Sequence, residues 1–253
     1  MAGHSKWSKV KRLKGALDIK RGKLFSKISK EIMIAAKLGG KNPLLNPRLR
    51  AAIQTARSQS MPNDNIERAI KKGTGELTAT AVEEMLYEGY APGGVAFLVE
   101  AATDNKNRTA ADLRSIFSRQ QGNLGGPGSV SHMFQRKGQI LIPKKSASEE
   151  TLFEAALKAG AEEFFPEDTF YTIITMPDQL YAVAEALKHA SISIETQKLT
   201  FLPQNTIHIS DERIAHQILR LYDTLDDCDD VLNVHSNFDI PEQLLLQAIS
   251  VDP

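Results

Sequence analysis

A change in hydrophobic periodicity near residue 73 divides this chain of 253 residues into two parts that must fold differently. Before it, apolar residues recur every three or four positions, which is the period of an amphipathic helix. After the segment "GTGELTATA", short apolar runs typical of strands alternate with longer helical patterns. The sequence therefore predicts a small all-helical N-terminal domain followed by α+β structure.

The N-terminal part predicts a basic arm and three helices. Residues 1–16 have little apolar periodicity, whereas a helix is expected from Leu17 to the Gly39-Gly40 pair, because glycine favours the left-handed conformation that ends helices. Its apolar residues share one face, and the opposite face holds Lys20, Lys23, Lys27, Lys30 and Lys37. Asn46 followed by Pro47 indicates the start of a second helix, and Asn63 or Asp64 is expected to cap a third.

The remaining strands and helices predict two α+β domains, one inserted into the other. Residues 135–205 alternate strand, helix, strand, helix and strand, which is enough for a two-layer domain of the ferredoxin-like type. The hairpin and helix before them are too thin to stand alone, and pairing them with the last strand-helix-strand unit gives a four-stranded layer. The expected fold class is thus α+β and multidomain, with domains at 1–78, at 79–134 together with 206–253, and at 135–205.

Charge, like hydrophobic periodicity, differs between the two parts of the chain. The whole chain has zero formal net charge, but residues 1–72 hold 18 basic and 4 acidic side chains, and the remainder is acidic by the same margin of 14. A field of one sign concentrated in one segment attracts a polyanion, so nucleic acid is the predicted partner. The alternative is that these lysines and arginines only solvate one face of a helical domain.

Signatures of catalysis, metal binding and cofactor binding are lacking from the sequence. No Walker loop, H-E-x-x-H or G-x-S-x-G motif occurs, and the histidines have no metal-ligand spacing. The glycine-rich "GNLGGPGSV" is interpreted as a turn rather than a phosphate cradle, and the carboxylates around Cys228, from Asp226 to Asp230, as a solvated helix end. We therefore expect no enzyme activity, no cofactor, no metal and no small-molecule substrate.

The arm contains the single tryptophan of the chain, Trp7, between Lys6 and Lys9. Lysines neutralise phosphates, and an indole ring can stack on an unpaired base or can anchor the arm in a hydrophobic core, and both roles stay open. The arm is Lys-rich and nearly patternless, unlike an Arg-rich amphipathic transit peptide. Because the sequence has no secretory signal and no apolar run long enough to span a membrane, we expect a cytoplasmic protein.

Several blocks of sequence, in order, resemble the YebC family. They are "GHSKW", "KRGKLFSKISKEI", "AAKLGG", "NPRLRAAI", "MPNDNIERAIKKG", "YEGYAPGGVAFLVEAATDNKNRTAADLR", "GSVSHMF" and "LNVHSNFDI". The resemblance implies three domains, one helical and two α+β, and no established catalytic activity. It also implies a role in gene expression, because family members are described as DNA-binding transcriptional regulators or are tied to the ribosome.

The resemblance also indicates which residues bind nucleic acid. Carried onto this sequence, "GHSKW" places contacts at Gly3, His4, Ser5, Lys6 and Trp7, and "KRGK" places them at Lys20, Arg21, Gly22 and Lys23. The charge pattern adds Lys9, Lys11, Arg12, Lys14, Lys27 and Lys30.

The charge pattern and the resemblance together predict a non-catalytic regulator acting on the ribosome or ribosomal RNA. The finer role, a translation factor that relieves stalling at proline-rich stretches, is implied by the resemblance to the YebC family. The nearly all-Lys polar face suits phosphate contacts better than base readout, and this favours ribosomal RNA over DNA. The alternative is a DNA-binding transcriptional regulator, since Arg48, Arg50 and Arg57 on the second helix can enter a groove. Rival hypotheses are an enzyme with a site between the α+β domains and an adaptor that binds an acidic protein.

Overall fold

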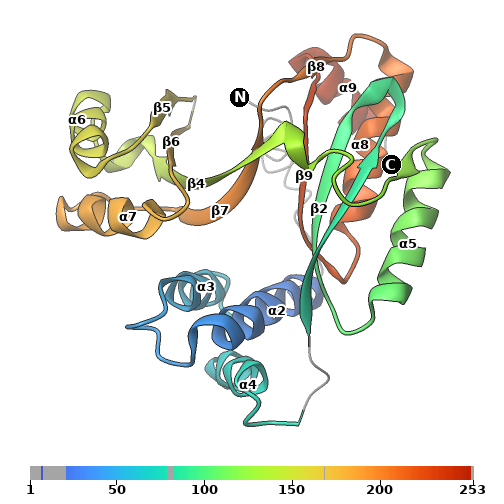
Figure 1. The fold of residues 1–253 in the computed structure, drawn as a ribbon. Coiled ribbons are helices and arrows are strands. Elements are labelled where there is room, and N and C mark those ends of the chain that lie inside the picture. Colours follow the sequence, from blue (N-terminus) through green and yellow to red (C-terminus); the bar gives the residue numbers. More distant parts are fainter. Residues whose placement is uncertain (1–6, 8–20, 79–81, 168, 252–253) are drawn as a thin grey trace. The chain divides into compact units, whose positions relative to one another are not determined.

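The computed structural model describes the chain except for residues 1–6, 8–20, 79–81, 168 and 252–253 (Figure 1). Two compact units emerge from the contacts between residues. The first unit combines Met1–Phe134 with Pro203–Pro253, and the second is Gln135–Leu202. The expected class, α+β with several domains and a helical N-terminal domain, is confirmed.

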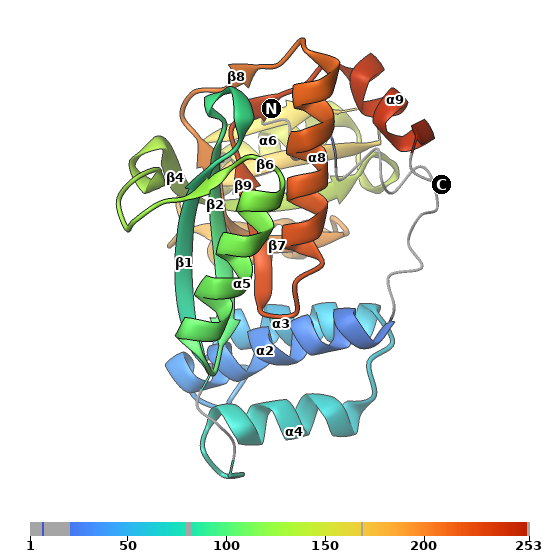
Figure 2. The same ribbon diagram turned by 90° about the vertical axis from the view of Figure 1, so that its right-hand side faces the viewer.

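From residue 21 on, the first unit has three helices that pack on one another, α2 (Arg21–Gly39), α3 (Pro47–Ser58) and α4 (Asn63–Gly73) (Figure 2). Their apolar faces form one separate core of which Ile32, Leu49 and Ala56 are fully or almost fully buried members. The predicted stop of the first helix is confirmed, because α2 ends at Gly39 and Gly40 has a φ of +80°. The start predicted at Leu17 lies outside the described residues.

The caps of α3 and α4 differ in how well the sequence predicted them. Asn46 caps α3 as expected, because its side-chain oxygen accepts from the Leu49 N–H at 3.0 Å. Its amide also donates to Ala35 O at 2.7 Å, which ties the start of α3 to the end of α2. The cap predicted for α4 is wrong: the N-cap is Pro62, and Asn63 and Asp64 already belong to the helix.

The α+β part of the first unit is a four-stranded sheet covered on one face by two helices. Its strands are β1 (Glu83–Tyr90), β2 (Ala96–Thr103), β3 (Asn123–Leu124) and β9 (Val231–Ser236), in the order β3-β1-β2-β9. Helices α5 (Lys106–Arg119) and α8 (Glu212–Asp226) supply Phe117 and Ile218 to a core shared with Phe97 of β2. The predicted hairpin turn is confirmed, since the short helix η1 (Pro92–Gly94) joins β1 to β2 with Gly93 at a φ of +77°.

Three features of this α+β part differ from the expectation: the sheet to which the segment "NTIHIS" belongs, the start of α5 and the presence of α9. The segment "NTIHIS" does not add a strand to the four-stranded sheet: β8 (Ile207–His208) pairs in parallel with β10 (Phe238–Asp239). The edge position belongs instead to β3, which is too short to give a period-two signal. Helix α5 begins at Lys106, within the expected loop, and helix α9 (Glu242–Val251) was missed.

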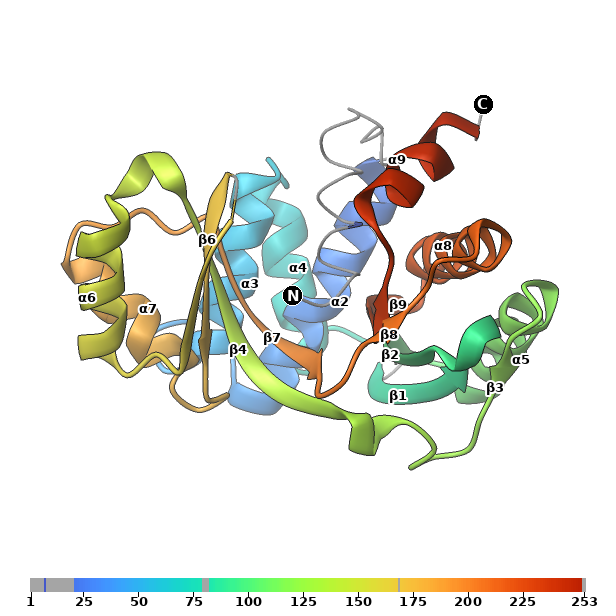
Figure 3. The same ribbon diagram turned by 90° about the horizontal axis from the view of Figure 1, so that it is seen from above.

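The second unit has a βαββαβ arrangement. Strands β4 (Phe134–Pro143), β5 (Glu163–Pro166), β6 (Phe170–Thr175) and β7 (Thr196–Pro203) follow the order β5-β6-β4-β7. Helices α6 (Glu149–Ala159) and α7 (Leu180–His189) lie on one face of this sheet (Figure 3). The expectation lacked β5, whose "EFFP" follows α6 closely. Two short helices, η2 (Ser131–Met133) and η3 (Lys144–Ser146), flank β4.

Candidate nucleic-acid interface

The polar face of α2 carries three of the predicted phosphate-binding lysines, and all three contact the end of α8. Lys23 Nζ donates to Asp227 O at 3.1 Å, about 200 residues away in the chain. Lys27 Nζ donates to the Asp226 carbonyl and lies 3.2 Å from its carboxylate. Lys30 Nζ donates to Asp229 O at 2.8 Å and to Asp230 Oδ1 at 2.6 Å. The lysines thus bind oxygen atoms of the protein itself.

The negative charge at the end of α8 explains why three lysines bind there. The last carbonyls of a helix have no partners within the helix and carry its negative dipole end. The last turn of α8 has no basic residue of its own, and Asp226 and Asp227 are followed by Asp229 and Asp230. Without a counter-charge, the carbonyls and the carboxylates at this end repel one another. The expected solvated helix end is confirmed for Asp227 and Asp229, whose side chains are exposed, whereas the carboxylates of Asp226 and Asp230 bind the α2 lysines.

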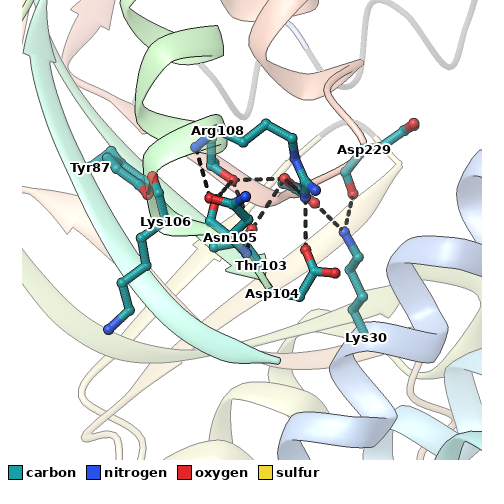
Figure 4. Close-up of polar contacts among 10 residues, drawn as sticks. Lys30, Tyr87, Thr103, Asp104, Asn105, Lys106, Arg108 and Asp229 are labelled. Carbon is teal, nitrogen blue, oxygen red and sulfur yellow. Dashed lines mark hydrogen bonds and ion pairs between the residues drawn. The ribbon is translucent and has the colours of Figure 1, made fainter. Parts of the chain in front are cut away.

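Asp230 is the most enclosed member of this cluster, and side chains from two domains converge on it. Figure 4 labels Lys30 of α2 and Arg108 of α5 among them. Besides Lys30, its carboxylate accepts from Thr109 Oγ1 at 2.7 Å and from Arg108 Nη2 at 2.9 Å. Thr103 Oγ1 is more distant, at 3.3 Å. Burial alone raises the pKa of Asp230, but the hydrogen bonds from Lys30, Arg108 and Thr109 and the charge of Lys30 outweigh it and hold the pKa well below its ordinary value.

The segment "TDNKNRT" supplies this convergence. It lies between β2 and α5, where Asn105 caps the helix by accepting from the Arg108 N–H at 3.1 Å. Thr103 Oγ1 also accepts from the Asn105 N–H at 2.9 Å and lies 2.8 Å from Thr109 Oγ1. The sequence of this segment favours a loop, and no role was expected for it. The available signal was Asn105 as an N-cap, with Arg108 and Thr109 in the first turn of a helix.

Trp7 anchors the arm and does not present its ring for stacking in this structure. It is 4% exposed and belongs to the same apolar cluster as Leu219, Tyr222 and Leu225 of α8. Its indole Nε1 donates to Asp223 Oδ1 at 2.9 Å, which satisfies the only polar group of the ring. Of the two roles left open by the sequence, the described geometry is that of the hydrophobic anchor.

The other predicted contacts are only partly described. Gly22 is exposed in the first turn of α2, and Arg21 opens that helix. Outside the described residues lie Gly3, His4, Ser5, Lys6, Lys9, Lys11, Arg12, Lys14 and Lys20.

Two carboxylates bind the guanidinium of Arg48, one of the three arginines that the sequence suggested for contacts in a groove. Its guanidinium binds Glu31 at 2.8 Å and Glu84 at 2.7 Å, so it joins α2, α3 and β1. Burial lowers the pKa of Arg48, but hydrogen bonds and charges from Glu31 and Glu84 outweigh that effect and raise the pKa above its ordinary value. Within the described part of the helical domain, the exposed cations with no ion pair or side-chain hydrogen bond are Arg57, Arg68, Lys71 and Lys72.

The glycine-rich loop after β3 already holds an anion, and that anion is part of the chain. The carboxylate of Glu88, on β1, accepts from the N–H groups of Gly128, Val130 and Ser131 at 2.6 to 2.8 Å. Burial raises the pKa of Glu88, but these backbone donors lower it below its ordinary value. Because Glu88 occupies the backbone donors, the loop offers them to no external phosphate. This agrees with the interpretation of the loop as structural.

Glu100, Asn233 and His235 form another polar group, on the sheet face opposite α5 and α8. His235 Nε2 lies 3.0 Å from Glu100 Oε2, and Asn233 Nδ2 donates to the same oxygen at 2.8 Å. The register that pairs Glu100 of β2 with Asn233 of β9 creates this group. Sequence analysis found no reason to pair these residues, because they are more than 130 positions apart. Among the described residues, no cluster has the composition of a metal site.

Asp230→Asn tests the convergence on Asp230. The amide presents N–H groups to donors, so we expect a loss of about 3 kcal/mol in the free energy of unfolding at neutral pH, measured by denaturant titration. The folded pKa is lowered from an unfolded value of about 3.9, so the stabilisation is present above that value and is lost as pH falls below about 4.

The stability difference between wild type and Asp230→Asn should therefore be constant between about pH 5 and pH 7 and shrink at lower pH. Asp229→Asn is the control, because Asp229 takes part through its backbone carbonyl while its side chain is exposed. A stability difference of equal size in both variants contradicts the assignment.

Trp7→Ala and Trp7→Phe separate anchoring from base stacking. Loss of a buried ring leaves a cavity, so Trp7→Ala should lower the free energy of unfolding by about 3 to 5 kcal/mol. Trp7→Phe keeps most of the apolar contact and loses the bond to Asp223, at a cost of about 1 to 2 kcal/mol. Circular dichroism during denaturation measures both. Unchanged stability together with weaker nucleic-acid binding would support stacking instead.

Comparison with known proteins follows the same division of the chain. The family model described as TACO1/YebC protein N-terminal domain matches residues 5–76, and the model of the TACO1/YebC second and third domain matches residues 82–238. A probable transcriptional regulatory protein of Desulfotalea psychrophila is 52% identical over 247 residues, which are 98% of this chain and 99% of that protein. Another protein of that name, from Aquifex aeolicus, is 49% identical over 97% of this chain and 98% of its own length.

A solved structure agrees with these matches. The crystal structure of a conserved hypothetical protein from Aquifex aeolicus superposes with a TM-score of 0.84 at 50% sequence identity, and the match covers 89% of this chain and 93% of that chain. Matching family models for all three domains, together with relatives that are about half identical along their whole length, show that this chain belongs to the TACO1/YebC family.

Proposed function

We propose that this chain is a nucleic-acid-binding regulator of gene expression whose first 72 residues hold a phosphate backbone. The observation that carries the proposal is the excess of 14 positive charges in this segment of a chain with zero net charge. Such a field attracts polyanions and supplies binding energy that does not depend on base sequence. Membership of a family whose relatives are named probable transcriptional regulatory proteins supports the same assignment.

The first candidate target is DNA, and the names of the relatives favour it. In this proposal the arm cations and the exposed side chains of α3 and α4 contact the duplex backbone. Arg57 lies in the last turn of α3, and Arg68, Lys71 and Lys72 share the outer face of α4. These cations can hold phosphates, and Arg57 can also reach a base edge.

The second candidate target is ribosomal RNA, and the composition of the basic surface favours it. The polar face of α2 is almost entirely lysine, and the salt bridges to Glu31 and Glu84 remove Arg48 from the set of possible base readers. Contacts of this kind recognise the backbone of a folded RNA rather than a sequence. The finer role as a translation factor that relieves stalling at proline-rich stretches rests on the family resemblance.

The proposal includes a cytoplasmic protein with no catalytic activity and no cofactor. Within the described residues, no helix has both the length and the apolar character needed to cross a membrane. The polar groups that could suggest a catalytic centre, Glu88 and the pair of Glu100 and His235, are engaged with other groups of the chain. We expect substrate screens to yield no turnover.

Replacing the arm cations Lys9, Lys11, Arg12 and Lys14 by Ala should weaken binding to all sequences alike. Each phosphate contact contributes about 0.9 to the slope of log affinity against log salt on duplex DNA, so the slope should flatten by about 3 to 4. Fluorescence anisotropy at several salt concentrations measures it. The control replaces Lys145 and Lys158, exposed cations of the second unit. An unchanged slope in the arm variant contradicts the assignment.

Crosslinking in cells, followed by sequencing of the bound nucleic acid from ribosomes and from chromosomal DNA separately, distinguishes the two targets. Enrichment of promoter sequences without ribosomal RNA supports the DNA-binding regulator. Enrichment of one region of ribosomal RNA supports the ribosomal role. Failure to enrich either nucleic acid contradicts the proposed function.

A further inference from the structure

The lysines of α2 that suit a phosphate backbone best are already in use. Lys23, Lys27 and Lys30 follow one another at four and three positions, so their side chains project along one stripe of the helix. Every one of these ammonium groups donates to an oxygen atom at the end of α8. The side chains of Lys27 and Lys30 are only 19% exposed. A polyanion reaches this stripe only when the end of α8 leaves it.

The contact is of a kind that phosphates can replace. It consists of ammonium groups facing three backbone carbonyls and the carboxylates of Asp226 and Asp230. A phosphodiester chain offers the same lysines a row of anionic oxygens. The exposed carboxylates of Asp227 and Asp229 add negative potential beside the stripe, which repels an approaching polyanion.

The domains that meet at this contact have separate apolar cores. The core of α2, α3 and α4 and the core beneath the four-stranded sheet are distinct clusters among the described residues. Polar contacts join these domains elsewhere too: Arg48 binds Glu84, and Lys37 Nζ donates to Val82 O at 3.1 Å. An apolar side chain of α2, Ile34, is also buried, at 3% exposed, and belongs to neither core. Ionic contacts weaken in the presence of competing ions, whereas buried apolar contacts do not. A polyanion can therefore compete for the ionic part of the contact that holds the helical domain.

We propose that the acidic end of α8, Asp226–Asp230, is an autoinhibitory segment that occupies Lys23, Lys27 and Lys30 until a phosphodiester backbone displaces it. The inference rests on the proposed function and adds its regulation. The resting protein binds through its remaining cations only, and full binding requires the helical domain to exchange an internal anion for an external one. The segment also sets a minimum charge and length for the nucleic acid, because a weakly charged or short one cannot complete the exchange.

The first test removes three of the four carboxylate charges of the segment and measures affinity. Asp226, Asp227 and Asp229 are replaced together by Asn, which retains the backbone carbonyls, and binding to a duplex DNA of about 30 base pairs is measured at low salt. The control replaces Glu149, Glu150 and Glu154 of α6 by Gln, and so changes the net charge equally in the second unit. Affinity should rise about tenfold more in the Asn variant than in the control.

The second test follows displacement in the unmodified chain. A carbodiimide joins an ammonium to a carboxylate that touches it, so it should link Lys27 to Asp226 and Lys30 to Asp230, as mass spectrometry of peptides reports. Saturating duplex DNA should reduce the yield of these links several-fold. The link between Lys137 and Glu162 in the second unit, which are 2.8 Å apart, should keep its yield and is the internal control.

The outcomes separate this inference from the proposed function. If wild type binds DNA but both charge variants gain affinity equally, or if the α2 links survive saturation, the autoinhibitory segment is wrong and the proposed function stands. If only the Asn variant binds, both are supported. If no variant binds DNA or ribosomal RNA, the proposed function fails, and the inference fails with it.

Discussion

The structure of the first unit depends on the meeting of three lysines with one helix end. The carbonyls at the end of α8 and the four aspartates from Asp226 to Asp230 would repel one another without a counter-charge, and no basic residue in the last turn of the helix provides one. Lys23, Lys27 and Lys30 provide it from a helix about 200 residues away. The same lysines were expected from the sequence to bind phosphates, so the proposed nucleic-acid binding draws on charges that the fold already uses.

Around this contact the other polar groups of the site are similarly engaged within the chain. Asp230 draws Lys30, Arg108 and Thr109 together, and so connects the helical domain to the start of α5. Glu88 fills the backbone donors of the glycine-rich loop, and Trp7 places its ring in the core and its N–H on Asp223. In the proposed function, a polyanion that uses these engaged groups must bind by exchange. Such binding is sensitive to salt and to the length of the polyanion.

Most helices were predictable from sequence because their signals are local, although α9 was missed. Periodicity, Asn46 before Pro47, and the Gly39-Gly40 pair act within a few residues, and the structure confirms them. The two-residue strand β3 was not predicted, because it forms only through its neighbours, and β8 was expected as a strand but in the wrong sheet. The cap of α4 was misassigned because Asn63, Asp64 and the preceding Pro62 all suit a helix start.

The candidate site was only partly predictable for the same reason. Charge counting found the basic stripe of α2 but could not show that its partner is the aspartate cluster, because the pairing spans the whole fold. Trp7 as anchor, Glu88 in its loop and His235 beside Glu100 likewise depend on residues far away in sequence. The family resemblance identified the blocks that meet there without stating which side chains touch.

A double-mutant cycle on Lys30 and Asp230 tests the central claim most directly. The free energy of unfolding is measured for wild type, Lys30→Met, Asp230→Asn and the double variant at low and at high salt. The account predicts a coupling of about 1 to 3 kcal/mol that decreases as salt increases. A coupling near zero at low salt would mean that α2 and the end of α8 are not joined by these charges, and would contradict the account.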